Sequence, residues 1–112
     1  MCTVKENGTA MIAKLCNSSD LPEDGTLRSF RGGAFDICVA RCDGENYAFA
    51  NECPHQAAPL SKGELDGCIV TCPYHGWRFS VATGEPEKEG DPPLIRYEIR
   101  ELEDEVFIQL PG

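Results

Sequence analysis

Long hydrophobic runs are absent from this sequence of 112 residues. Its longest apolar stretches, such as residues 10–13 and 68–70, fall far short of the roughly 20 residues that a membrane-spanning helix needs. The N-terminus also lacks a basic region followed by an apolar block, so no secretory signal is visible. We therefore expect a soluble, cytoplasmic protein without a membrane partner.

Basic residues and histidines are scarce. Ten Lys and Arg stand against 19 Asp and Glu, which gives a formal net charge of −9. Nucleic acid is excluded as an expected partner, because phosphate binding requires a basic face. There are only 2 histidines but 7 cysteines. An odd number of cysteines in a chain without a secretion signal favours metal ligation over a disulfide framework.

Long helical periodicity is also missing, whereas turn residues are frequent, with 11 Gly and 8 Pro. Short runs rich in β-branched and aromatic residues lie between the turns and predict strands. We expect these strands at residues 11–16, 26–30, 34–41, 47–51, 68–72, 77–80, 94–100 and 105–110. Asp43-Gly44 predicts a hairpin turn, and a single helical turn capped by Ser18 or Ser19 is expected within residues 17–25. The pattern predicts one all-β domain over residues 1–112, a small antiparallel sandwich or barrel.

Both histidines lie in two short segments that interrupt the strand pattern. The first reads C-P-H over residues 53–55, and the second reads C-P-Y-H-G-W over residues 72–77. The proline after each cysteine fixes φ and stiffens the segment. Two stiff loops, each with one thiolate and one imidazole, can converge on one inorganic core. Two thiolates and two neutral imidazoles leave an oxidised [2Fe–2S] core uncharged, so an added electron is opposed less than it is by four thiolates.

The pattern C-x-H-x16-C-x2-H resembles the Rieske iron–sulfur family, and the strand pattern on both sides extends the resemblance over nearly the whole chain. The resemblance implies a Rieske-like β-sandwich whose two loops hold a Rieske-type [2Fe–2S] cluster as cofactor and metal site. It implies that Cys53 and Cys72 bind one iron. It also implies that His55 and His75 bind the other through Nδ1. A structural zinc site is the alternative, but zinc sites usually place two to four residues between the first ligand pair, whereas one residue separates Cys53 from His55.

Four positions indicate which branch of the family the chain resembles. Respiratory members carry an extra cysteine in each loop, joined as a disulfide, together with hydroxyl donors to the cluster sulfurs. Ala58 and Tyr74 stand at the cysteine positions here, and Trp77 and Phe79 at the hydroxyl positions. Hydrogen bonds to sulfur raise the potential, so the resemblance is to the low-potential branch.

The expected function follows from this resemblance. A terminal oxygenase needs a second iron site with two histidines and a carboxylate, and no histidine remains to build one. The resemblance implies a carrier rather than an enzyme: a ferredoxin that passes single electrons from a flavin-dependent NAD(P)H reductase to a terminal oxygenase of a dioxygenase system. The Rieske-like small subunit of NADH-dependent nitrite reductase is the alternative, and a cluster-based redox sensor is a third class.

Other residues carry weaker predictions. Residues 90–94 resemble the proline-rich loop that covers a Rieske cluster, although they also fit an ordinary turn. Gln56 and Trp77 border the docking surface, or Trp77 anchors the core instead. Residues 85–105 hold nine acids, whereas residues 53–79 hold two acids and two bases, so a nearly neutral cluster tip is expected. The remaining cysteines are assigned to packing or chance: Cys2, Cys16, Cys38, Cys42 and Cys68.

Overall fold

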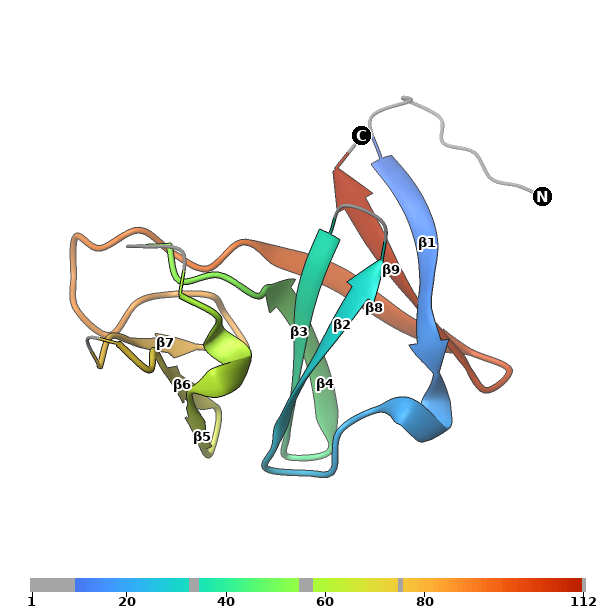
Figure 1. The fold of residues 1–112 in the computed structure, drawn as a ribbon, viewed down its shortest axis with the longest axis horizontal. Coiled ribbons are helices and arrows are strands. Elements are labelled where there is room, and N and C mark those ends of the chain that lie inside the picture. The colour runs from blue at the N-terminus through green and yellow to red at the C-terminus, as the bar shows by residue number, and fades with distance from the viewer. Residues whose placement is uncertain (1–9, 33–34, 55–57, 75, 112) are drawn as a thin grey trace.

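The computed structural model describes residues 10–32, 35–54, 58–74 and 76–111 (Figure 1). The strands in these ranges are β1 (Ala10–Asn17), β2 (Leu27–Gly32), β3 (Phe35–Cys42), β4 (Glu45–Ala50), β5 (Glu64–Asp66), β6 (Ile69–Thr71), β7 (Arg78–Ser80), β8 (Arg96–Leu102) and β9 (Glu105–Pro111). Two short 3-10 helices, η1 (Ser18–Asp20) and η2 (Leu60–Lys62), lie between strands. Within the described part of the chain, no helix has the length and apolar character that crossing a bilayer demands.

Six strands form one antiparallel sheet in the order β1-β9-β8-β4-β3-β2, here called the base. The sheet curls, so that its edge strands β1 and β2 approach each other. Asp43 and Gly44 form the turn between β3 and β4, with φ values of 53° and 78°. A two-residue hairpin requires positive φ at both positions, which Asp-Gly tolerates, so the predicted hairpin is confirmed.

The other three strands form a small antiparallel sheet in the order β5-β6-β7, which lies to one side of the base (Figure 1). Both predicted cysteine–histidine segments belong to this side of the molecule. We call residues 53–81 the loop unit, because they include the small sheet and both segments. A long connection leads from β7 back to β8 and so returns the chain from the loop unit to the base.

Alternation along β3 places its two faces in two different cores. Ile37 and Val39 point into a core inside the curled base, together with Ala48 and Ile108. Cys38 and its same-face neighbours on β3 point the other way, into a core that the base shares with the loop unit. Side chains on a strand point to opposite faces in turn, so one strand joins the two cores. The loop unit is thereby packed directly on the base.

The all-β prediction is confirmed, and each predicted strand has an observed counterpart with shifted ends. Strand β5 has no counterpart among the predicted strands, because its three residues, Glu64-Leu65-Asp66, are short and mostly charged. The predicted helical turn exists as η1, but the predicted cap is wrong. Asn17 occupies the N-cap, and its backbone N–H donates to the Asp20 carboxylate at 3.1 Å.

Candidate metal centre

The two cysteine–histidine segments are closed by the same backbone hydrogen bond. The Cys53 N–H donates to the Ala58 carbonyl at 2.9 Å, and the Cys72 N–H donates to the Trp77 carbonyl at 2.7 Å. In each segment the cysteine begins a loop that returns five positions later. The two segments thus share the same closing hydrogen bond, from the N–H of the cysteine to a carbonyl five positions later.

Both cysteine side chains are buried. Cys53 and Cys72 are each 2% exposed, and both belong to the core shared by the base and the loop unit. Strand β6 leads directly into Cys72, and β4 is followed closely by Cys53. The core around the two cysteines is completed by fully buried apolar side chains: Ala58, Leu60, Val70, Phe79 and Val81. Neither Cys53 nor Cys72 takes part in a disulfide.

The second loop turns at Gly76, where φ is +73°. An L-residue with a side chain rarely adopts this conformation, which accounts for a glycine at this position. The Gly76 N–H donates to the Cys72 carbonyl at 3.2 Å, so the turn is tied back to the start of the loop. Trp77 follows it and is partly buried against the shared core. Of the two roles predicted for Trp77, the packing favours the core anchor.

The predicted histidine ligands, His55 and His75, lie outside the described residues, and so does Gln56. The structure therefore brings together the thiol half of the predicted ligand set on two matching loops. The sequence places one histidine inside each of these loops. Within the described ranges, no other group of His, Cys, Asp and Glu side chains is arranged to hold a metal ion.

A strap, residues 85–94, runs along the outer edge of the small sheet. The Ser80 N–H donates to the Glu85 carbonyl at 2.9 Å, and the Glu87 N–H donates to the Arg78 carbonyl at 2.8 Å. The strap ends at Leu94, which is buried in the same core as Cys53 and Cys72. Burial of Leu94 fixes the end of the strap, and the covering role of residues 90–94 stays a prediction.

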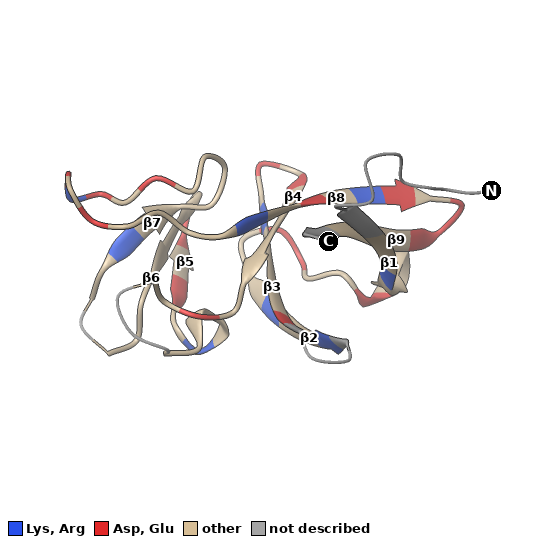
Figure 2. Cartoon of the chain, turned by 90° about the horizontal axis from the view of Figure 1, so that it is seen from above, with Lys and Arg blue, Asp and Glu red and all other residues tan. Residues whose placement is uncertain are grey.

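Uncharged residues dominate the described surface of the two loops. Pro73 and Gly76 are exposed, and Tyr74 is 66% exposed. Nine of the 19 acidic residues lie on the strap or in β8, β9 and the turn between them, and Figure 2 shows acidic residues in these segments. The distribution agrees with the expected neutral tip and the acidic surplus elsewhere.

Asn51 connects the base to the first loop and was not singled out by the sequence. It is 8% exposed, and its side-chain oxygen accepts the Ser61 N–H at 2.7 Å. Its side-chain nitrogen donates to the Asp36 carboxylate of β3 at 3.3 Å, and its backbone N–H donates to the Asp36 carbonyl at 2.9 Å. A buried amide pays a desolvation cost unless it is hydrogen-bonded, so these contacts hold η2 in register with β3. An asparagine two residues before the predicted ligand Cys53 is the sequence signal that could have found it.

The remaining cysteines behave in two ways. Cys38 is buried in the shared core, and burial raises the pKa of its thiol to about 12, so packing is its role as predicted. Burial, followed by the nearby Asp20 carboxylate, also raises the pKa of the Cys16 thiol. The prediction is wrong for Cys42 and Cys68, which form a disulfide between the base and the loop unit. Cys2 lies outside the described residues.

The donor set fits an iron–sulfur cluster. Two buried cysteines outside the disulfide begin two loops beside one shared apolar core, and each loop has a histidine in its sequence. Zinc sites usually place two to four residues between the first ligand pair, more than the single residue between Cys53 and His55. An all-β base that presents two such loops defines a small iron–sulfur protein.

Comparison with known proteins agrees with this class. Residues 11–98 match the Rieske [2Fe-2S] domain family. The chain is 39% identical over 97 residues to ferredoxin CarAc of Metapseudomonas resinovorans, covering 85% of this chain and 90% of that protein. It is 32% identical over 102 residues to the ferredoxin component of biphenyl 2,3-dioxygenase of Rhodococcus jostii (strain RHA1), covering 90% of this chain and 94% of that protein.

A solved structure also matches. A chain from the complex of reduced oxygenase and oxidized ferredoxin in carbazole 1,9a-dioxygenase superposes with a TM-score of 0.76 at 38% identity. The match covers 87% of this chain and 91% of that chain. The chain therefore belongs to the Rieske [2Fe–2S] domain family, and its cofactor is a Rieske-type [2Fe–2S] cluster. The resemblance drawn from the sequence is confirmed, and these relatives do not favour the nitrite reductase alternative.

Proposed function

We propose that this protein is a soluble cytoplasmic ferredoxin that carries single electrons from a flavin-dependent NAD(P)H reductase to the terminal oxygenase of a ring-hydroxylating system. In this proposal Cys53 and Cys72 bind one iron, and His55 and His75 bind the other. The cluster supplies one-electron chemistry when bound. The chain itself binds no organic substrate and acts as a component rather than as the catalyst.

The matched pair of loops is the observation that carries the proposal. Each loop starts with a buried cysteine and is closed from that cysteine's own N–H. The closing hydrogen bonds fix both cysteine backbones, and the shared core fixes both side chains. Preorganised thiols on rigid loops reduce the rearrangement that accompanies a change in charge at the site, which is what a carrier requires.

The relatives support the choice of acceptor. Two of them are named as ferredoxins or ferredoxin components of dioxygenases, and a matching chain comes from a complex of oxygenase and ferredoxin. The exposed, uncharged surface at Pro73, Tyr74 and Gly76 suits contact with a partner protein. Uncharged groups at the centre of an interface avoid the cost of desolvating a charge.

The test is a reconstituted electron-transfer chain. Purified protein is mixed with a flavin-dependent oxygenase reductase and NADH, and bleaching of the visible cluster absorption is followed. Addition of an oxidised Rieske-type terminal oxygenase then restores the absorption, whereas addition of a nitrite reductase catalytic subunit with nitrite leaves it bleached. Restoration by the nitrite reductase alone would contradict the proposal.

A further inference from the structure

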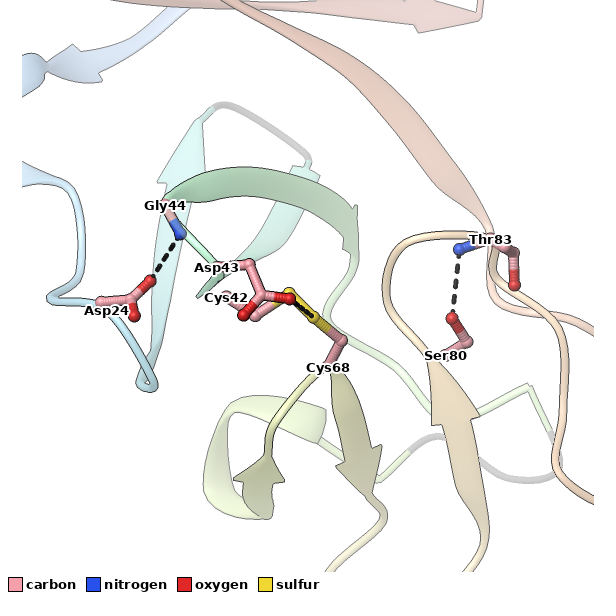
Figure 3. The surroundings of a disulfide bond; sticks show 7 residues. All are labelled: Asp24, Cys42, Asp43, Gly44, Cys68, Ser80 and Thr83. Carbon is pink, nitrogen blue, oxygen red and sulfur yellow. Dashed lines mark hydrogen bonds between the residues drawn. A yellow bond between two sulfur atoms is a disulfide. The ribbon is translucent and has the colours of Figure 1, made fainter.

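The disulfide between Cys42 and Cys68 is the one covalent link between side chains of the base and of the loop unit among the described residues. Cys42 is the last residue of β3, and Cys68 directly precedes β6 (Figure 3). Their Cα atoms lie 5.4 Å apart although the residues are 26 positions apart in sequence. Cys42 directly precedes the Asp43-Gly44 turn, and Cys68 lies with Gly67 in the turn between β5 and β6. The two turns meet where the two sheets meet.

The disulfide lies at the start of β6, and the predicted ligand Cys72 follows the other end of this strand. Strand β6 separates Cys68 from Cys72, and the Cys68 carbonyl accepts the Val81 N–H at 2.9 Å. The Cys68 backbone therefore holds both the start of β6 and the residue that follows β7. A covalent bond from Cys68 to β3 ties this whole end of the small sheet to the base.

Cys42 and Cys68 differ in their exposure to solvent. Cys42 is 2% exposed and belongs to the shared core, whereas Cys68 is half-buried at the edge of that core. A thiolate from solvent therefore reaches the disulfide at Cys68 and expels Cys42 as the leaving group. The buried Cys42 thiol then stays beside the mixed disulfide and can reverse the step. A dithiol reductant overcomes this reversal, because its second sulfur resolves the mixed disulfide.

The Asp43 carboxylate lies beside the Cys68 sulfur, which is the atom that a reductant attacks. The Asp43 Oδ2 atom lies 3.7 Å from the Cys68 Sγ atom (Figure 3). The turn that positions Asp43 is fixed, since the next N–H, that of Gly44, donates to the Asp24 carboxylate at 2.9 Å. The carboxylate can accept a hydrogen bond from a reduced Cys68 thiol. Its negative charge also repels an incoming anion from the disulfide.

We propose that Cys42 and Cys68 form a reversible dithiol–disulfide site that reacts with a dithiol reductant at Cys68 and, when oxidised, locks the loop unit to the base. In the reductive direction, one sulfur of the dithiol bonds to Cys68 Sγ as Cys42 leaves. The second sulfur of the dithiol then bonds to the first and releases Cys68. Two electrons and two protons pass from the dithiol to the cysteine pair, and the reductant becomes a cyclic disulfide.

The first test compares the holoprotein with and without dithiothreitol. Alkylation and mass spectrometry of the untreated protein leave Cys42 and Cys68 unmodified, and both are modified after reduction, with Cys68 first. Reduction lowers the melting temperature by on the order of 10 °C, as expected for opening a loop of this length. The double variant Cys42→Ser/Cys68→Ser melts low and does not respond to dithiothreitol. The matched single variant Cys16→Ser keeps the full response.

The proposal is overturned if untreated protein alkylates at both cysteines under air, or if the double variant responds to dithiothreitol as the wild type does. A response of the double variant would show that dithiothreitol acts at the cluster rather than at the disulfide. Retention of the visible absorption, recorded in the same samples, separates the two sites.

The second test addresses Asp43. Dihydrolipoate carries one more negative charge than dithiothreitol. The rate at which dihydrolipoate reduces the disulfide, divided by the rate for dithiothreitol, therefore reports the electric field at Cys68. Asp43→Asn raises this ratio about threefold, the effect of removing one charge a few ångströms away in water. Glu103→Gln, in the turn between β8 and β9 of the base, leaves the ratio unchanged. An equal ratio in Asp43→Asn and the wild type would contradict the role of the carboxylate.

Discussion

The base and the loop unit are held together by different means. Strands of the base run for six to eight residues and pair along antiparallel ladders, with a register shift between β1 and β9 and only two residue pairs between β4 and β8. Each strand of the small sheet has three residues. The base also encloses a core of its own around Ile37 and Val39, whereas the buried side chains of the loop unit pack against the base. Sheets with so few paired residues are not independently stable.

This difference explains how one small domain combines a durable scaffold with a cofactor site. The loop unit depends on three additions to its own strands: the shared core, the links at Asn51 and Cys42–Cys68, and the cluster. The base contributes to the shared core but also has a core of its own that includes none of these additions. Substitutions that remove one of these additions should therefore destabilise the loop unit more than the base. The following variants test this selectivity, from the largest expected effect to the smallest.

Loss of a ligand should have the largest effect. Cys53→Ser or Cys72→Ser yields colourless protein, because a cluster that cross-links two loops contributes its binding energy to folding. Amide exchange then becomes fast in β5–β7 and stays slow in β3 and β4. The buried non-ligand variant Cys38→Ser keeps the visible spectrum. Full cluster absorption in either ligand variant would contradict the assignment.

Cavities in the two cores should lower the free energy of unfolding by similar amounts but should differ in their effect on cluster retention. Leu60 lies in the shared core and Ile37 in the core of the base, and both are almost fully buried. Truncation of either to alanine costs about 2–5 kcal/mol of unfolding free energy, measured with denaturant. Leu60→Ala alone also accelerates the loss of visible absorption at denaturant concentrations below the transition. Equal acceleration in both variants would show that the two regions do not respond separately.

The buried amide between the regions should have a smaller effect. Asn51→Ala removes the hydrogen bonds to Ser61 and Asp36 and leaves the part-buried Ser61 N–H without its side-chain acceptor, at a cost of about 1–3 kcal/mol. Hydrogen exchange at the Ser61 amide rises while exchange in β8 and β9 does not. Asn46→Ala is the control, since within the described chain the Asn46 Oδ1 atom is buried without a partner and its loss costs little. Equal costs for the two variants would rule out Asn51 as a link.

Much of this architecture could be predicted from local sequence, and the exceptions have physical reasons. The alternating runs and the Asp43-Gly44 turn predict the base, because strand and hairpin signals are local. Strand β5 escapes prediction because its pairing with β6 outweighs a charged sequence of only three residues. Spacing of the cysteines and histidines predicts which loops carry the site, but the closing hydrogen bonds of these loops depend on tertiary folding.

The disulfide is the clearest case of information that lies outside any local window. Cys42 and Cys68 are far apart in sequence and meet only because the end of β3 lies at the start of β6. Without that junction, packing was the more general expectation for a cysteine. An adjacent Asp-Gly pair, at residues 43–44 and 66–67, is the one sequence feature that the two cysteines share.

Hydrogen bonding to the cluster sulfurs should produce the smallest effect. Phe79 is fully buried in the core that contains Cys53 and Cys72. Phe79→Tyr places a hydroxyl in this core. One hydrogen bond to sulfur, worth about 1 kcal/mol, raises the reduction potential by on the order of 50 mV. Voltammetry of the variant and the wild type checks this, with Tyr47→Phe as a control at a partly buried site on β4. A lower potential in Phe79→Tyr would contradict the explanation for the low-potential branch.

A redox titration at neutral pH, followed by EPR, tests the central claim most directly. If Cys53, His55, Cys72 and His75 hold a Rieske-type cluster without hydroxyl donors or a loop disulfide, one electron is taken up near the bottom of the Rieske range, on the order of −150 mV. The reduced protein then shows the EPR signal of a single unpaired spin. A protein without an EPR signal after reduction, or one with a strongly positive potential, would contradict the account.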